Sequence, residues 1–150
     1  MAREPTFPNK AKMVRSANLL RLILAVAPAL YLVIAALVTL RGGFASDQAF
    51  VLVLFFALVF VSAANIGLTI FFQTRETLMQ VGATPDPVGR TFLTMATGSI
   101  LSETHAIYGL VLTLISGSLF YGIGFTIVTW ASLWWVRRRF KQNLASLPNA

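Results

Sequence analysis

The 150-residue chain contains no cysteine. Without thiols it cannot form disulfides, thiolate nucleophiles, Cys-ligated zinc sites or iron–sulfur clusters. Charge is scarce as well: charged residues make up 11% of the chain and histidine occurs once, whereas 57% of the residues are hydrophobic and the mean hydropathy is +0.75. Because a soluble globular domain carries about 25% charged residues, this composition excludes that class and indicates a protein of the lipid bilayer.

Sequence patterns of known catalytic sites are also missing. The chain has no HExxH, GxSxG or GxxxxGK[ST] pattern, so we expect no catalysis by the chain alone, no metal site and no cofactor. The formal net charge of +7 arises from basic residues at the two ends and beside apolar runs, not from a basic face interleaved with aromatics. Membrane lipid is therefore the expected partner of this charge, and nucleic acid is not.

Four apolar stretches are each long enough to cross the bilayer, for which about 20 helical residues suffice. We predict an all-α bundle of four transmembrane helices within residues 18–136, at 18–40, 49–72, 91–114 and 119–136. The last two helices come from one apolar run, which we divide at 115–118 because turn residues occur only there near its middle. Segment 41–48 predicts a tight turn, and 1–17 and 137–150 are expected to be an N-terminal tail and a basic C-terminal tail.

Lysine and arginine collect in alternate segments outside the predicted helices. Cytoplasmic segments are rich in these residues, and in a chain with four spans they alternate with segments on the other side. We therefore expect a multi-pass protein of a bacterial-type inner (plasma) membrane with both termini cytoplasmic. Tryptophans followed by arginines end the fourth span, where rings and long cations favour the headgroup region. These predicted membrane anchors are Trp130, Trp134, Trp135, Arg137, Arg138 and Arg139.

Glu103 is the one acidic residue inside a predicted span, near the middle of the third. An ionised carboxylate at that depth costs about 2.5–3.5 kcal/mol on insertion scales, and protonation removes most of this cost. Such residues commonly carry ions, although a protonated carboxyl can instead join two helices through a hydrogen bond. Asn65 or Thr69 of the second span is expected to face Glu103, whereas His105 points away from it and is expected to bond to another helix or to water.

Small residues recur along the predicted spans at a spacing of four. In the third span they form a narrow stripe, beside Glu103, that lets two helix backbones approach closely. A shorter stripe is predicted on the second span. The residues of the two stripes are Thr94, Gly98, Ser102 and Ala106, and Ala63 and Gly67.

The second loop and third span contain an ordered series of features. A proline and an acidic residue come first, then a glycine followed by a basic residue, a helix bearing Met and Gly, a carboxylate, and an Ala-Ile-Tyr-Gly-Leu-Val tail. Their positions are Pro85, Asp86, Gly89, Arg90, Met95, Gly98, Glu103 and 106–111. In this register, about residues 73–114 resemble the ion-carrying hairpin of the rotor-ring c subunit (proteolipid) of rotary F/V-type ATPases.

The resemblance implies that the second and third helices form a c-like hairpin with Glu103 as the ion-binding carboxylate. It also implies that Tyr108 shields or orients this carboxylate, and that the loop from Pro85 through Asp86 and Gly89 to Arg90 faces the central stalk. The hydroxyl of Thr104 is similar to that of sodium-binding members, but no glutamine stands at matching depth on the partner helix. Protons are therefore favoured, with Asn65 as a further polar group of the ion-binding set.

Two hypotheses follow. In the first, the chain is a proton-translocating subunit of an ATP synthase or ATPase complex, and its partners are rotary-ATPase subunits or further copies of itself. In the second, it is a non-catalytic accessory or assembly subunit of a larger bioenergetic complex, with Glu103 as a structural contact between helices. Either role needs a partner, because one carboxylate in one small protein provides no route across the membrane.

Overall fold

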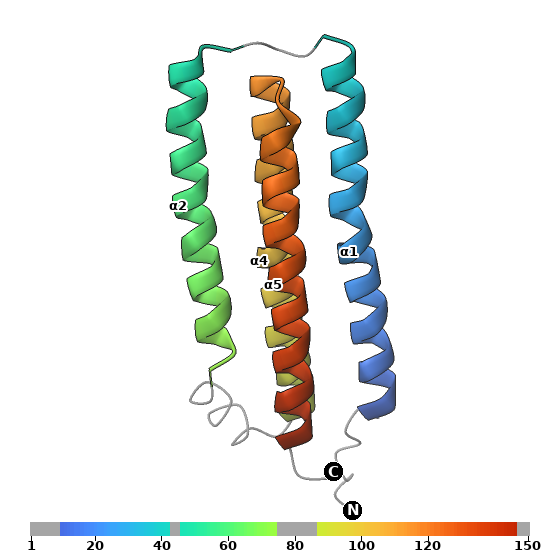
Figure 1. Ribbon diagram of the computed structural model, residues 1–150. Coiled ribbons are helices and arrows are strands. Elements are labelled where there is room, and N and C mark those ends of the chain that lie inside the picture. Colours follow the sequence, from blue (N-terminus) through green and yellow to red (C-terminus); the bar gives the residue numbers. More distant parts are fainter. Residues whose placement is uncertain (1–9, 43–45, 75–86, 147–150) are drawn as a thin grey trace, which may run out of the picture.

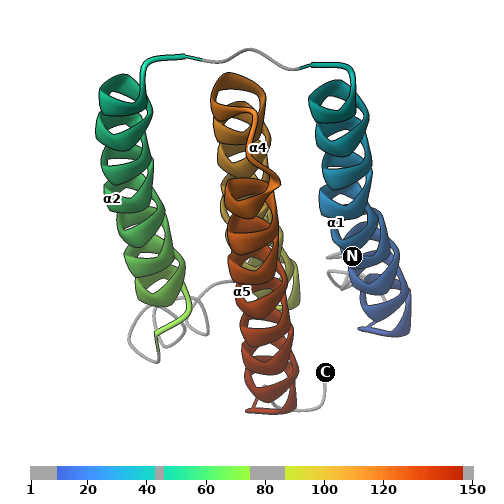
Figure 2. The ribbon, with the colours of Figure 1, turned by 45° about the horizontal axis from the view of Figure 1, so that its top comes forward.

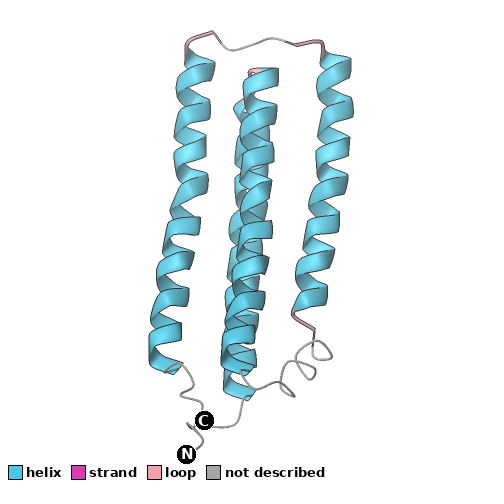
Figure 3. Cartoon of the chain, turned by 180° about the vertical axis from the view of Figure 1, so that it is seen from behind, coloured by secondary structure: helices cyan, strands magenta, loops and turns pink. Residues whose placement is uncertain are grey.

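The computed structural model describes residues 10–42, 46–74 and 87–146, which fold into helices α1 (Lys10–Leu40), α2 (Gln48–Phe72), α4 (Pro87–Ser116) and α5 (Leu119–Ser146) (Figure 1). Each of these helices is long and apolar enough to span a membrane. Figure 3 shows that the regular elements within these residues are all helical. The predicted fold class, an all-α protein with four candidate membrane spans, is confirmed.

The turn between α4 and α5 falls where the sequence predicted it. Gly117 adopts a φ of +67°, a left-handed conformation that glycine tolerates best, and its N–H donates to the Thr113 carbonyl at 2.9 Å. The Ser118 N–H donates to the Ser116 hydroxyl at 3.1 Å. These bonds end one helix and let the next begin after two intervening residues.

Helix α5 continues ten residues past the predicted end of the fourth span. Its extension is held by packing as well as by helix-forming residues: Phe140 is buried in a cluster with Ala17 of α1, Met95 of α4 and Val136 of α5. The basic segment that begins at 137 is thus helical as far as Ser146.

Helices α4 and α5 form the centre of the bundle, and α1 and α2 flank them on opposite sides (Figures 1 and 2). The prediction of a tight turn at 41–48 is wrong, because α1 and α2 lie on opposite sides of the central pair and not next to each other. The Ser46 N–H donates to the Ile115 carbonyl at the end of α4, at 3.2 Å, and Asp47 caps α2. The start of α1 and the end of α5 lie at the same end of the bundle (Figure 1).

Burial follows this arrangement. In the most apolar 18-residue window of each helix, 44% of the residues of α4 are buried, compared with 11% in α2. The exposed positions of α1 and α2 are mainly Leu, Val, Ile and Phe, which suit contact with lipid. The central helix is therefore α4, the helix that carries Glu103.

Candidate functional site

Glu103 lies near the middle of α4 and is half-buried on the side that faces α1. Its Oε1 accepts a hydrogen bond from the Tyr31 hydroxyl of α1 at 3.2 Å. The expected partners, Asn65 and Thr69, are on α2 and bond elsewhere: Asn65 donates to Thr104, and Thr69 donates to the Asn65 carbonyl. Positions 103 and 104 differ by about 100° around a helix, so neighbouring residues of α4 face different flanking helices.

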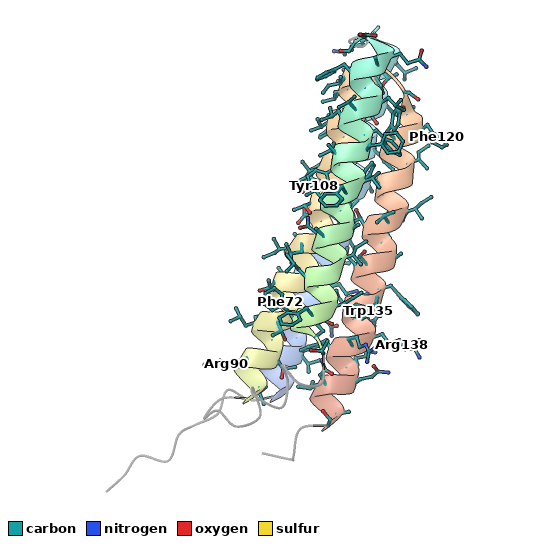
Figure 4. The ribbon with its side chains drawn as sticks, turned by 90° about the vertical axis from the view of Figure 1, so that its left-hand side faces the viewer. Phe72, Arg90, Tyr108, Phe120, Trp135 and Arg138 are labelled. Carbon is teal, nitrogen blue, oxygen red and sulfur yellow. The ribbon has the colours of Figure 1, made fainter. Side chains whose placement is uncertain are left out.

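The α2 side of α4 carries a second polar cluster at the same depth. The Asn65 Nδ2 donates to the Thr104 Oγ1 at 3.1 Å and, more weakly, to the Tyr108 hydroxyl at 3.5 Å. The Thr104 hydroxyl itself donates to the Leu101 carbonyl at 2.7 Å. Tyr108 therefore lies with Asn65 and Thr104, facing α2 (Figure 4), and makes no hydrogen bond to Glu103.

His105 is buried between α2 and α4 and is only 1% exposed. Its Nδ1 lies 3.1 Å from the Ser62 hydroxyl of α2, which is the interhelical bond expected from the sequence. A buried histidine with a hydroxyl partner is satisfied without a charge. His105 thus joins two helices and does not form a relay with Glu103.

One face of α4 is left uncovered by the other three helices. Along it, Leu93, Ile100 and Ile107 recur every seven residues and are 62%, 56% and 42% exposed. Glu103 is three residues after Ile100 and four before Ile107, so it borders this face. The carboxylate is therefore shielded by α1 on one side and lies beside an open apolar surface on the other.

The predicted small-residue stripe of α4 lies mostly inside the bundle. Gly98, Ser102 and Ala106 are buried, and Thr94 is half-buried. A Cβ added at Gly98 would come within 2.8 Å of the Gln73 Nε2. The stripe thus lets α4 approach its neighbours closely, with Glu103 next to it.

The shorter stripe of α2 has a different position. Ala63 and Gly67 are exposed, and nothing lies within 4 Å of a Cβ added at Gly67. The polar residues Ser62, Asn65 and Thr69 instead turn toward α4. Ser62 and Asn65 form hydrogen bonds to α4, which satisfy groups that lipid cannot. Thr69 packs against Gly98, and its hydroxyl donates to the Asn65 carbonyl within α2. Within this chain, the α2 stripe makes no close helix contact.

Two of the four residues of the predicted stalk-facing loop are in the first turn of α4. Gly89 and Arg90 follow Pro87, which starts the helix at a position that proline favours, and Arg90 is exposed. Pro85 and Asp86 lie outside the described residues.

The aromatic and basic residues at the end of α5 are largely exposed. Trp130 donates from its Nε1 to the Ala25 carbonyl of α1 at 3.2 Å. Two cation–π contacts follow, each between residues one turn apart: Arg138 lies over the ring of Trp134 at 5.8 Å, and Arg139 over that of Trp135 at 5.4 Å. Arg137 is half-buried. We refer to this end of the bundle as the basic end.

Sequence reasoning missed Tyr31 and Ser62, the partners of Glu103 and His105. The sequence did contain a signal that these two side chains need a partner. Both have a polar end and lie inside an apolar run of a helix that mostly faces lipid. What was missing was the order of helices around α4. Among the described residues, no group of three His, Cys, Asp or Glu side chains is placed to hold a metal ion.

No family model, curated protein sequence or solved structure matches this chain. The fold and the contacts around Glu103 are therefore the basis on which a function can be argued.

Proposed function

We propose that this four-helix membrane protein is a proton-translocating subunit that resembles the rotor-ring c subunit of a rotary ATPase and carries protons on Glu103. The single observation that carries the proposal is the position of this carboxylate: mid-span, half-buried, and beside the uncovered face of α4. A carboxyl that alternates between a shielded and an accessible environment can take up and release a proton.

Tyr31 has a defined part in this mechanism. Its hydroxyl donates to Oε1 of Glu103, so it holds the side chain against α1 and supplies a hydrogen bond to the charged form. A partner that approaches the uncovered face can compete for the carboxylate from the open side. Proton release then requires the Glu103 side chain to exchange the Tyr31 hydroxyl for a polar group of that partner, which needs only a small movement of the carboxylate.

The two half-paths that connect Glu103 with water must come from outside the chain. The polar cluster of Asn65, Thr104 and Tyr108 is at the same depth and forms hydrogen bonds within itself, so it does not extend toward either membrane surface. We infer that neighbouring copies or rotary-ATPase subunits supply these paths, with the basic end of the bundle in the cytoplasm of a bacterial-type cell.

A second candidate function is favoured by the same hydrogen bond. Because Tyr31 and Glu103 come from different helices, their bond joins α1 to α4. A protein in which Glu103 only fastens these helices would serve as an accessory or assembly subunit of a bioenergetic complex. The two functions differ in whether the carboxyl must titrate.

The substitution Glu103→Gln separates them. A glutamine Oε1 still accepts from the Tyr31 hydroxyl, so folding and assembly should survive, but the amide cannot carry a proton. The matched control is Asp47→Asn, the same chemical change at the cap of α2 outside the spans, where asparagine also caps well. Proton uptake is measured in inverted membrane vesicles that contain the intact complex, alongside recovery of the complex.

We expect Glu103→Gln to abolish uptake at normal recovery, and Asp47→Asn to leave both unchanged. Normal uptake by Glu103→Gln would refute proton carriage and leave the accessory role. Native mass spectrometry of the intact complex tests the rotor resemblance separately: many copies beside rotary-ATPase subunits support it, and one copy beside unrelated subunits contradicts it.

A further inference from the structure

An open groove runs between α2 and α5, which both pack on α4 but leave space between themselves. It consists of two adjoining cavities of about 280 and 380 Å³ that share Ile66 of α2 and Val128 of α5. Along α5 it reaches from Phe120 to Trp135 (Figure 4), which corresponds to about 22 Å of helix. We call this feature the α2–α5 groove.

The walls of the groove are apolar in effect. Two of the hydroxyls that border it are already used inside the bundle: Ser62 pairs with His105, and Thr69 donates to the carbonyl of Asn65. Ser132 and Tyr121 also line it, and the other lining residues are glycine, aliphatic or aromatic. A flexible hydrocarbon chain therefore suits the groove.

The basic end of the groove carries positive charge. Trp135 lines this end, and the guanidinium of Arg139 lies over its ring at 5.4 Å. The two acidic residues in the described part of the chain are far away, Glu103 at mid-span and Asp47 at the opposite end of the bundle. Arg139 is exposed, and a guanidinium can bind a phosphate through two parallel hydrogen bonds.

We propose that the α2–α5 groove is a binding site for an anionic phospholipid, whose acyl chain lies between α2 and α5 and whose phosphate contacts Arg139. A basic residue at the mouth of an apolar cleft between membrane helices is the arrangement that anionic headgroups recognise. One leaflet provides about 15 Å of hydrocarbon, so the groove is long enough for a chain over the full depth of that leaflet. The site is separate from Glu103 and independent of whether Glu103 carries protons.

The experiment is native mass spectrometry of the intact, gently solubilised protein. Phosphatidylglycerol and phosphatidylcholine with identical acyl chains are added in equal amounts, and the lipid retained by each chain is counted. We expect one retained phosphatidylglycerol in preference to phosphatidylcholine. One basic residue near the headgroup is worth about a five-fold change in lipid binding, so Arg139→Gln should lower retention about five-fold.

Two matched controls define the site. Arg90→Gln removes an exposed arginine from the first turn of α4, near the same end of the bundle but outside the groove, and should leave retention unchanged. Ala131→Phe places a ring in the basic-end cavity and should lower retention, whereas Ala64→Phe adds the same ring to an exposed position of α2 outside the groove and should have no effect.

Equal retention of the two lipids, or an Arg139→Gln protein that binds phosphatidylglycerol normally, would overturn the proposal. A change in copy number or partner content caused by Ala131→Phe, with lipid retention unchanged, would also overturn it, because the groove would then be a helix interface. The arginine variants alter exposed side chains, so they decide the question even if Ala131→Phe fails to fold.

Discussion

Removing the Tyr31 hydroxyl tests whether the hydrogen bond to Glu103 contributes to the stability of the bundle. Tyr31→Phe deletes one oxygen and keeps the ring, so the loss is confined to the 3.2 Å bond between α1 and α4. Hydrogen bonds between membrane helices contribute about 0.6 kcal/mol on average and about 1.7 kcal/mol at most. Because a carboxylate is a strong acceptor and this one is half-buried, we expect a cost of about 1 kcal/mol, or about five-fold in the unfolding equilibrium.

The assay is a double-mutant cycle of unfolding free energies in detergent micelles. Tyr31→Phe is compared in the native protein and in Glu103→Leu, which has no acceptor. If the bond is responsible, the tyrosine substitution destabilises only the native background and is near neutral beside leucine. Tyr121→Phe is the matched control, since the contacts of that ring are aromatic, and it should stay within about 0.5 kcal/mol.

An equal cost of Tyr31→Phe in both backgrounds would refute the reasoning. The effect would then come from ring packing or from the denatured state, and Glu103 would have no energetic link to α1. The position of its carboxylate beside the uncovered face would no longer be explained by Tyr31.

The other contacts of α4 give further predictions. Gly109→Ala should destabilise the protein by about 1–3 kcal/mol, because its Cβ would lie 2.7 Å from the Phe125 Cβ, whereas Gly67→Ala meets open space and should be neutral or slightly stabilising. Thermal unfolding of the two variants side by side checks this, and equal melting temperatures would contradict it. Asn65→Ala removes the donor to Thr104 and should cost about 1 kcal/mol. A Thr104→Ala background should remove most of that cost, and a full cost there would show that the pair is not coupled.

The hydropathy of the sequence and the spacing of its residues determined the transmembrane helices of this protein and the depth of its acidic residue. Four spans, the division at Gly117 and the position of Glu103 in mid-span follow from local rules, because a backbone in lipid must satisfy its own hydrogen bonds and therefore forms helices. The burial of Gly98 on α4 followed as well from its small-residue stripe, whereas the same spacing on α2 left Ala63 and Gly67 exposed.

Only the tertiary structure decided which helices meet. The sequence gives no order of helices around α4, because lipid and protein interiors are equally apolar and hydrophobicity does not distinguish one neighbour from another. Tyr31 became the partner of Glu103, and Asn65 that of Thr104, because α1 and α2 lie on opposite sides of the central pair. The α2–α5 groove arises from the same placement, since α2 packs on α4 without closing onto α5.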